Sequence, residues 1–120
     1  MEHNLYDLSI LSEMVYGDTE FMQDLVNTFI EHAPADSDEL ANYAKEKNWE
    51  ETSKKAHKLK SSIRTIGVTS LSDIIVKIEM DAKNKNNIDT ICDNINRFTS
   101  ILDLVVERLK NETFDNIKKK

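Results

Sequence analysis

The sequence predicts an all-α fold, an antiparallel up-down-up-down four-helix bundle with one or two additional short helices at the N-terminus. Among 120 residues there are only two glycines and one proline, which leaves few places for sharp turns and favours long helices. No segment shows the alternating Val, Thr and Tyr pattern of strands. Near the C-terminus, apolar residues recur at steps of three and four, as on the buried seam of a bundle. They are Ile88, Ile91, Ile95, Phe98, Leu102, Val105 and Leu109.

Three helical segments are predicted in the first half of the chain. The first covers residues 5–15, and Asp18 is a suitable N-cap for the second, which covers residues 19–33. Pro34 lacks an N–H and fits best in the first turn of a helix, so a third helix is predicted from there to about residue 47. Its first turn would then be acidic, as the helix dipole prefers. The predicted apolar stripe of the second segment consists of Phe21, Met22, Leu25, Val26, Phe29 and Ile30.

Three further helices are predicted in the second half. Asn48 can cap the fourth, which ends at Gly67, the expected residue for a left-handed C-terminal cap. Ser70, followed by Asp73, resembles a capping pair for the fifth. A loop at residues 84–87 separates the fifth helix from the sixth, whose pattern fades after about residue 111. The apolar face of the fifth helix is Leu71, Ile74, Ile75, Ile78 and Ala82.

Length and composition indicate one domain over residues 1–120, with residues 112–120 as a frayed tail. The single cysteine, Cys92, cannot form an internal disulfide and fits a reducing compartment. No apolar run approaches the roughly 20 residues needed to span a bilayer, and the N-terminus lacks the regions of a signal peptide. We expect a cytoplasmic monomer without direct membrane contact, because the apolar stripe of each helix is used within one bundle. A domain cut from a larger membrane-bound receptor has the same features.

The charge distribution bears on the choice of partner. A formal net charge of −6 argues against nucleic acid, whose phosphates require basic surface. Between residues 54 and 64, however, there are five basic residues and no acidic one. This run predicts a local positive patch suited to an anionic group or an acidic partner, although a solvated lysine-rich helix face is an alternative interpretation.

His57 lies in the middle of the predicted fourth helix. At 3.6 residues per turn it shares one face with Ser53, Lys60, Ser61 and Arg64. The residues expected in the core follow another face, and they are Trp49, Thr52, Ala56, Leu59, Ile63 and Ile66. The serines one turn away in each direction are too small to cover the ring. An accessible imidazole beside a cation is well suited to carry a phosphoryl group.

The motif His57-x-Leu59-Lys60-Ser61-Ser62, with Gly67-Val68 and Leu71 downstream, resembles the signature of histidine-containing phosphotransfer domains. The usual pattern of that family is His-x-Leu-Lys-Gly-Ser, followed by Gly-Ala and a leucine at these offsets. Two positions depart from it, because Ser61 replaces a glycine and Val68 an alanine. Serine is small and compatible with a helix, so Ser61 would narrow the approach only slightly or tune which partners dock.

The resemblance implies a role for each matched position. His57 would accept a phosphoryl group from an aspartyl phosphate on a receiver domain and pass it to the receiver of a response regulator. Lys60 would partly neutralise the phosphoryl oxygens. A Gln or Glu on the following helix bonds the histidine in that family, and by offset it is Glu79 here. The predicted docking surface and helix end comprise Ser53, Lys58, Ser61, Ser62, Arg64 and Gly67.

The same resemblance predicts a phosphotransfer intermediate without ATP binding or autokinase activity, and no glycine-rich phosphate loop occurs in the sequence. No cofactor or metal site is predicted in the chain, and the Mg²⁺ needed for transfer would be held by the acidic pocket of the receiver.

Three alternative functions follow from the same residues. A helical protein-interaction module with an inert histidine is the main one. A metal or haem bundle would need several inward-facing ligands at helical spacing, whereas the three histidines lie on separate segments. A phosphohydrolase would need a second histidine or an aspartate pair beside His57.

Overall fold

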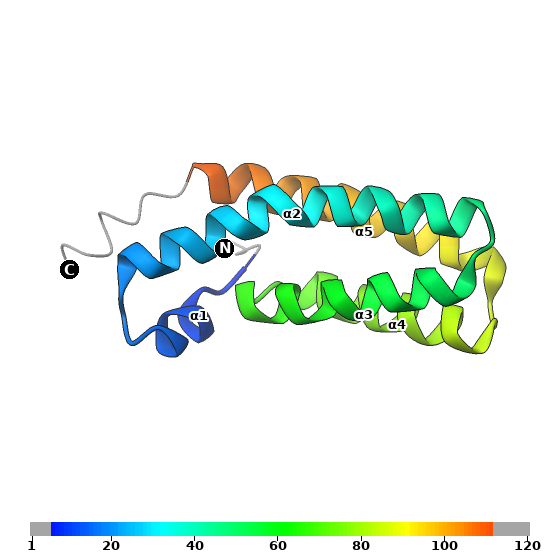
Figure 1. Ribbon diagram of the computed structural model, residues 1–120, viewed down its shortest axis with the longest axis horizontal. Coiled ribbons are helices and arrows are strands. Elements are labelled where there is room, and N and C mark those ends of the chain that lie inside the picture. The colour runs from blue at the N-terminus through cyan, green and yellow to red at the C-terminus, as the bar shows by residue number, and fades with distance from the viewer. Residues whose placement is uncertain (1–5, 112–120) are drawn as a thin grey trace, which may run out of the picture.

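A computed structural model describes residues 6–111, and within this range it contains five helices and no strand. Helix α1 is Ser9–Met14, α2 is Thr19–Lys45, α3 is Trp49–Ile66, α4 is Thr69–Asn84 and α5 is Ile88–Lys110. The four long helices form an antiparallel bundle, with α1 at the end where α2 begins and α3 ends (Figure 1). The predicted fold class is therefore confirmed, with one short N-terminal helix. The predicted start at Leu5 and the tail at residues 112–120 lie outside the described residues.

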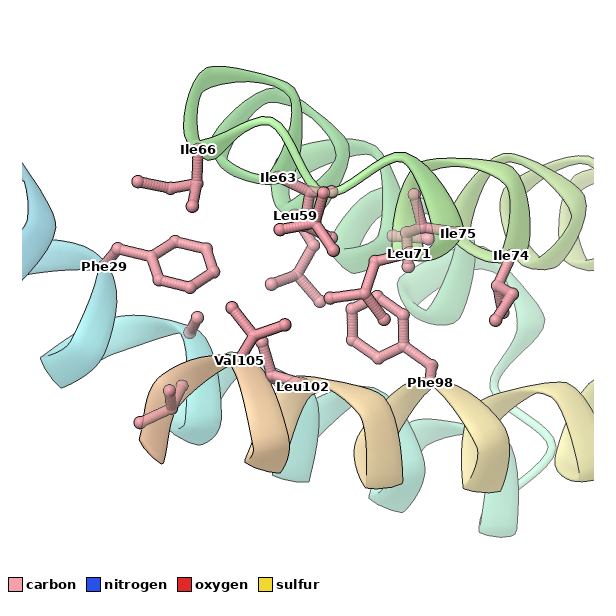
Figure 2. Packing of buried hydrophobic residues seen from close by; sticks show 14 of the residues in the cluster. Phe29, Leu59, Ile63, Ile66, Leu71, Ile74, Ile75, Phe98, Leu102 and Val105 are labelled. Atoms are coloured by element: carbon pink, nitrogen blue, oxygen red, sulfur yellow. The ribbon is translucent and has the colours of Figure 1, made fainter. Parts of the chain in front are cut away.

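Each long helix packs against two others in a ring. Helix α3 contacts α2 and α4, and α5 contacts the same two helices from the other side. Two buried phenylalanines, Phe29 and Phe98, lie at the centre of the bundle with aliphatic side chains between them. Figure 2 shows this packing, which includes Leu59, Leu71 and Leu102. None of the helices in residues 6–111 is long and apolar enough to cross a membrane.

The predicted break at Pro34 is wrong, because α2 continues through it to Lys45. A proline inside a helix leaves the carbonyl of Ile30 without its usual N–H partner, at a cost of about 3 kcal/mol relative to alanine. Ala33, Ser37 and Leu40, on either side of the proline, are all buried. The continuous buried face outweighs the lost hydrogen bond, since burying a single large aliphatic side chain contributes roughly 1.5–3 kcal/mol.

The predicted caps of α2 and α3 are confirmed. Asp18 Oδ1 accepts a hydrogen bond from the Phe21 N–H at 3.1 Å, and Asn48 Oδ1 accepts one from the Glu51 N–H at 3.3 Å. The predicted cap of α4 at Ser70 is wrong. The helix begins one residue earlier, at Thr69, and the residue before it, Val68, supplies no side-chain cap. Val68 is buried in the core instead, so apolar packing fixes the start of α4.

Gly67 ends α3 in the left-handed conformation, with φ at 78°. Its N–H donates to the Ile63 carbonyl at 2.9 Å, which closes the helix. Its own carbonyl accepts from the Asp7 N–H at 2.9 Å, so the segment before α1 lies directly on this turn. A Cβ at Gly67 would collide with the Asp7 carbonyl oxygen. The glycine is therefore required both by the turn and by the chain packed against it.

Two apolar residues of the predicted stripes lie outside the core. Phe21, at the start of α2, is 50% exposed, and Ile88, at the start of α5, is 39% exposed. Both occupy the first turn of their helix.

Candidate functional site

His57 lies on the water-facing side of α3, and 69% of its side chain is exposed. Its neighbours in sequence on the buried side, Ala56 and Leu59, are in the core. Helix α3 is therefore held by its apolar face while the imidazole remains open to solvent. The accessible position predicted for this ring is confirmed.

Glu79 reaches the ring from α4. Its Oε2 lies 2.8 Å from His57 Nδ1, and only 15% of its side chain is exposed. The contact arises because residues 67–68 alone join α3 to α4, which forces the two helices into a close antiparallel pair. Ile78 is buried beside it, so Glu79 stands at the edge of the core and faces α3. The predicted contact between Glu79 and His57 is present.

Lys60 also contacts Glu79, which the sequence pattern did not predict. Lys60 Nζ lies 2.9 Å from Glu79 Oε1, and its side chain is 21% exposed. One carboxylate thus holds both the imidazole and the lysine one turn further along α3. Burial alone would raise the pKa of Glu79, but the hydrogen bonds from Lys60 and His57 outweigh burial and hold that pKa below its ordinary value of 4.5.

This geometry distinguishes the two ring nitrogens of His57. An ionised carboxylate only accepts hydrogen bonds, so Nδ1 carries the proton and donates it toward Glu79. In the neutral ring, Nε2 then holds the free electron pair. In the part of the chain that the structure describes, Nε2 has no hydrogen-bond partner. The exposed nitrogen is thus the nucleophilic one.

The lysines of the basic run on α3 are paired with acidic side chains, which the sequence pattern did not predict. Lys55 lies between Glu39, at 2.6 Å, and Asp36, at 3.4 Å. Lys58 lies 3.4 Å from Asp36, and Lys54 pairs with glutamates of its own helix. A helix starting at Pro34 would place Asp36 and Glu39 in its first turn. They lie in the middle of α2, where they face the lysines of α3.

Two grooves flank the imidazole. One has a volume of about 650 Å³ and runs between α3 and α4, with Ser53 in its wall beside His57. The other, of about 430 Å³, runs between α2 and α3 from Leu25 to Lys58 and includes Ser62. Two members of the predicted docking surface, Ser61 and Arg64, are exposed on the same face of α3. Gly67 is half-buried against the segment before α1. It therefore shapes the turn between α3 and α4 and does not belong to the exposed surface around His57.

Exposed apolar side chains near the α2–α3 groove form a feature that the sequence analysis missed. Ile10 and Met14 of α1, Tyr16 of the following turn and Phe21 of α2 are each at least half exposed. A signal existed in the sequence, because these residues are apolar but fall out of register with the buried Leu11, Val15 and Met22. We call these four residues the α1–α2 apolar patch.

No group of three or more His, Cys, Asp and Glu side chains able to hold a metal occurs among residues 6–111.

Comparison with known proteins agrees with this geometry. The phosphorelay intermediate protein YPD1 of Candida albicans is 32% identical over 81 residues, which cover 65% of this chain and 44% of that relative. The chain thus spans less than half the length of the relative that it matches. No solved structure matches it significantly. Residues 24–112, which include His57, Lys60 and Glu79, match the Hpt domain model. With its helical bundle and exposed helical histidine, the chain belongs to the Hpt domain family.

Proposed function

We propose that this chain is a histidine phosphocarrier of a multistep phosphorelay, with His57 as the phosphoacceptor. The observation that carries the proposal is the pairing of His57 Nδ1 with Glu79 at 2.8 Å on an otherwise exposed ring. It leaves Nε2 as a nucleophile facing solvent, within reach of a partner protein. The match to the Hpt family and the printed description of the relative as a phosphorelay intermediate support the proposal.

The proposed reaction needs little covalent chemistry from the protein. The electron pair of Nε2 attacks the phosphorus of an aspartyl phosphate on a receiver domain, the P–O bond breaks, and the aspartate leaves as a carboxylate. Lys60 lies one turn from His57 on the same face and supplies positive charge for the phosphoryl oxygens. The reverse sequence passes the group to an aspartate on a second receiver. The receiver would hold the Mg²⁺, and neither ATP binding nor autokinase activity is part of the proposal.

We propose the α1–α2 apolar patch and the adjoining α2–α3 groove as the docking surface for the receiver. Exposed apolar side chains that gather on a protein surface mark interaction sites. The groove is lined both by Leu25, one helical turn after Phe21 of the patch, and by Lys58, which is next to His57 in sequence. A receiver seated there would bring its aspartate to the exposed Nε2. Met14→Asp should weaken receiver binding while leaving chemical phosphorylation of His57 unchanged.

The proposal is tested by intact-mass measurement after incubation with phosphoramidate or a phosphorylated receiver domain. The wild type should gain one phosphoryl group that is stable in alkali and lost in acid, and His57→Gln should gain none. His32→Gln is the matched control, because His32 is also an exposed helical histidine but lacks a lysine and a buried carboxylate beside it. No addition from several competent donors would contradict the proposal and favour a helical protein-interaction module.

A further inference from the structure

The carboxylate of Glu79 makes two charged contacts at once. Its Oε2 accepts from His57 Nδ1 at 2.8 Å and its Oε1 from Lys60 Nζ at 2.9 Å. Both Glu79 and Lys60 are largely shielded from water, whereas the ring that they share is open. Charge at Glu79 therefore acts on the imidazole with less solvent screening than a surface ion pair would.

On the basis of the proposed role of His57, we propose that Glu79 keeps Nδ1 of the phosphorylated ring protonated. Glu79 thereby holds the phosphoryl group in its readily transferred form and releases Lys60 to the phosphoryl oxygens. A neutral amide at position 79 would accept the same hydrogen bond but would not stabilise a cationic ring. The negative charge of Glu79, in addition to the hydrogen bond that it accepts, is therefore what stabilises the protonated ring.

The chemistry of transfer explains why this proton matters. When the bond between Nε2 and phosphorus breaks, its electron pair stays on Nε2. A ring that is protonated at Nδ1 leaves as neutral imidazole, whereas an unprotonated ring leaves as an anion and is a much poorer leaving group. The phosphorus gains a bond to an aspartate oxygen of the receiver or, in hydrolysis, to a water molecule whose protons remain on the phosphate. No other reactant is needed.

The other charged side chains near the ring do not replace Glu79 in stabilising a protonated ring. The α3–α4 groove beside His57 is lined by the charged side chains of Glu50, Lys54, Glu79, Lys83 and Lys85. Three of the five are cations, and they disfavour a positive charge on the ring. On the other flank, Asp36 of α2 is bound by Lys55 and Lys58. Glu79 is thus the carboxylate in contact with the ring, and it opposes the surrounding lysines.

Lys60 links ring protonation to phosphorylation. In the unphosphorylated protein, Lys60 neutralises part of the charge on Glu79. A phosphoryl group on Nε2 adds roughly two negative charges, which compete with Glu79 for the ammonium group of Lys60. As Lys60 moves toward the phosphoryl oxygens, the carboxylate interacts more strongly with Nδ1–H. Phosphorylation of His57 therefore strengthens the contact between Glu79 and Nδ1–H, and this contact favours transfer of the phosphoryl group.

The test compares wild type and Glu79→Gln, each phosphorylated with phosphoramidate. ¹⁵N NMR of the phosphorylated ring reports whether Nδ1 is protonated, and intact mass reports the rate of phosphoryl loss to water at neutral pH. Glu79→Gln should lower the protonated fraction and slow phosphoryl loss at least about tenfold, since each unit of change in proton affinity alters the population tenfold. Glu50→Gln is the matched control. Glu50 lines the same groove but is exposed and pairs with Lys54 instead of the ring, so both readouts should change far less than in Glu79→Gln.

Lys60→Met provides a second, independent reading. With the competing cation removed, the Nδ1–H signal of the phosphorylated ring should persist to higher pH than in wild type. Unchanged Nδ1 protonation and unchanged phosphoryl loss in Glu79→Gln, or no change of the Nδ1–H signal in Lys60→Met, would overturn the inference. Failure of wild type to take up a phosphoryl group would overturn the proposed function as well, so the two failures are distinguishable.

Discussion

At the scale of single residues, the properties of His57 are set by a side chain 22 positions away. Glu79 holds Nδ1 and so leaves Nε2 as the nitrogen with a free electron pair in the neutral ring. The same carboxylate fixes Lys60, which would otherwise sample many conformations. The site is therefore preorganised by one carboxylate that is largely shielded from solvent.

The first prediction concerns the pH dependence of stability at Glu79. Because folding lowers the pKa of Glu79 below its ordinary value of 4.5, its contribution to stability is fully present above pH 4.5 and is lost as pH falls through the lower, folded value. Urea unfolding of wild type and Glu79→Gln between pH 2 and 7 should show a stability difference that is constant near neutrality and shrinks in acid. A difference that does not depend on pH would contradict the assignment.

Gly67 and Gly17 offer a second prediction, because they share a backbone conformation but not an environment. Their φ values are 78° and 75°, whereas only Gly67 has a neighbouring atom where a Cβ would lie. Gly17→Ala should cost about 1–2 kcal/mol from left-handed strain alone. Gly67→Ala should cost clearly more, since the segment at Asp7 must also move. Chemical denaturation of both variants measures the difference, and equal losses would show that Asp7 contributes nothing to this turn.

At the scale of secondary-structure elements, α2 shows how burial overrides a local signal. Its 27 residues include Pro34 in the interior, where sequence preference alone predicts a break. The buried residues on both sides of the proline belong to one continuous face against α3 and α5. Continuity of α2 also places Asp36 and Glu39 beside the lysines of α3.

The third prediction follows from this conflict. Pro34→Ala should raise the free energy of unfolding by about 1–3 kcal/mol, because it restores an N–H donor to the Ile30 carbonyl. Greater freedom of the unfolded chain reduces the gain by roughly 0.4–1 kcal/mol. Thermal and chemical unfolding give the magnitude. A loss of stability would mean that packing of the half-buried proline ring outweighs the missing hydrogen bond.

At the scale of the whole molecule, one core supports the site. The buried hydrophobic residues of all five helices form a single cluster, and the side chains labelled in Figure 2 come from α2, α3, α4 and α5. Because α3 and α4 are held side by side by this core and by the short turn between them, the distance from Glu79 to His57 depends on the folded bundle. Stability and phosphotransfer should therefore be lost together on unfolding, in one cooperative transition.

The fourth prediction uses two leucines of α5. Leu102 is fully buried, whereas Leu104 is 60% exposed. Leu102→Ala should lower the free energy of unfolding by about 2–5 kcal/mol, from lost burial and the cavity left behind. Leu104→Ala should change it by no more than about 0.5 kcal/mol. Comparable losses in denaturant midpoint for the two variants would contradict the placement of α5 in the bundle.

The amino-acid pattern alone determined the long helices, the faces that they bury, and the position of His57 on the exposed side of α3. Apolar spacing, two side-chain caps and Gly67 suffice for this, because they act within one helix or at its ends. The contact with Glu79 was predicted only through the resemblance to the family, since helical spacing cannot say which residues of another helix lie opposite. Similarly, no local pattern predicted that α2 would continue through Pro34.

Tertiary structure decided the remaining features, for a common physical reason. The pairing of Lys60 with Glu79, the neutralisation of the α3 lysines by Asp36 and Glu39, and the exposure of Phe21 all depend on which helices are neighbours and how far they extend. Local preferences determine which residues are helical. The summed burial of many side chains determines which helix faces meet, and thereby which charges reach the reactive ring.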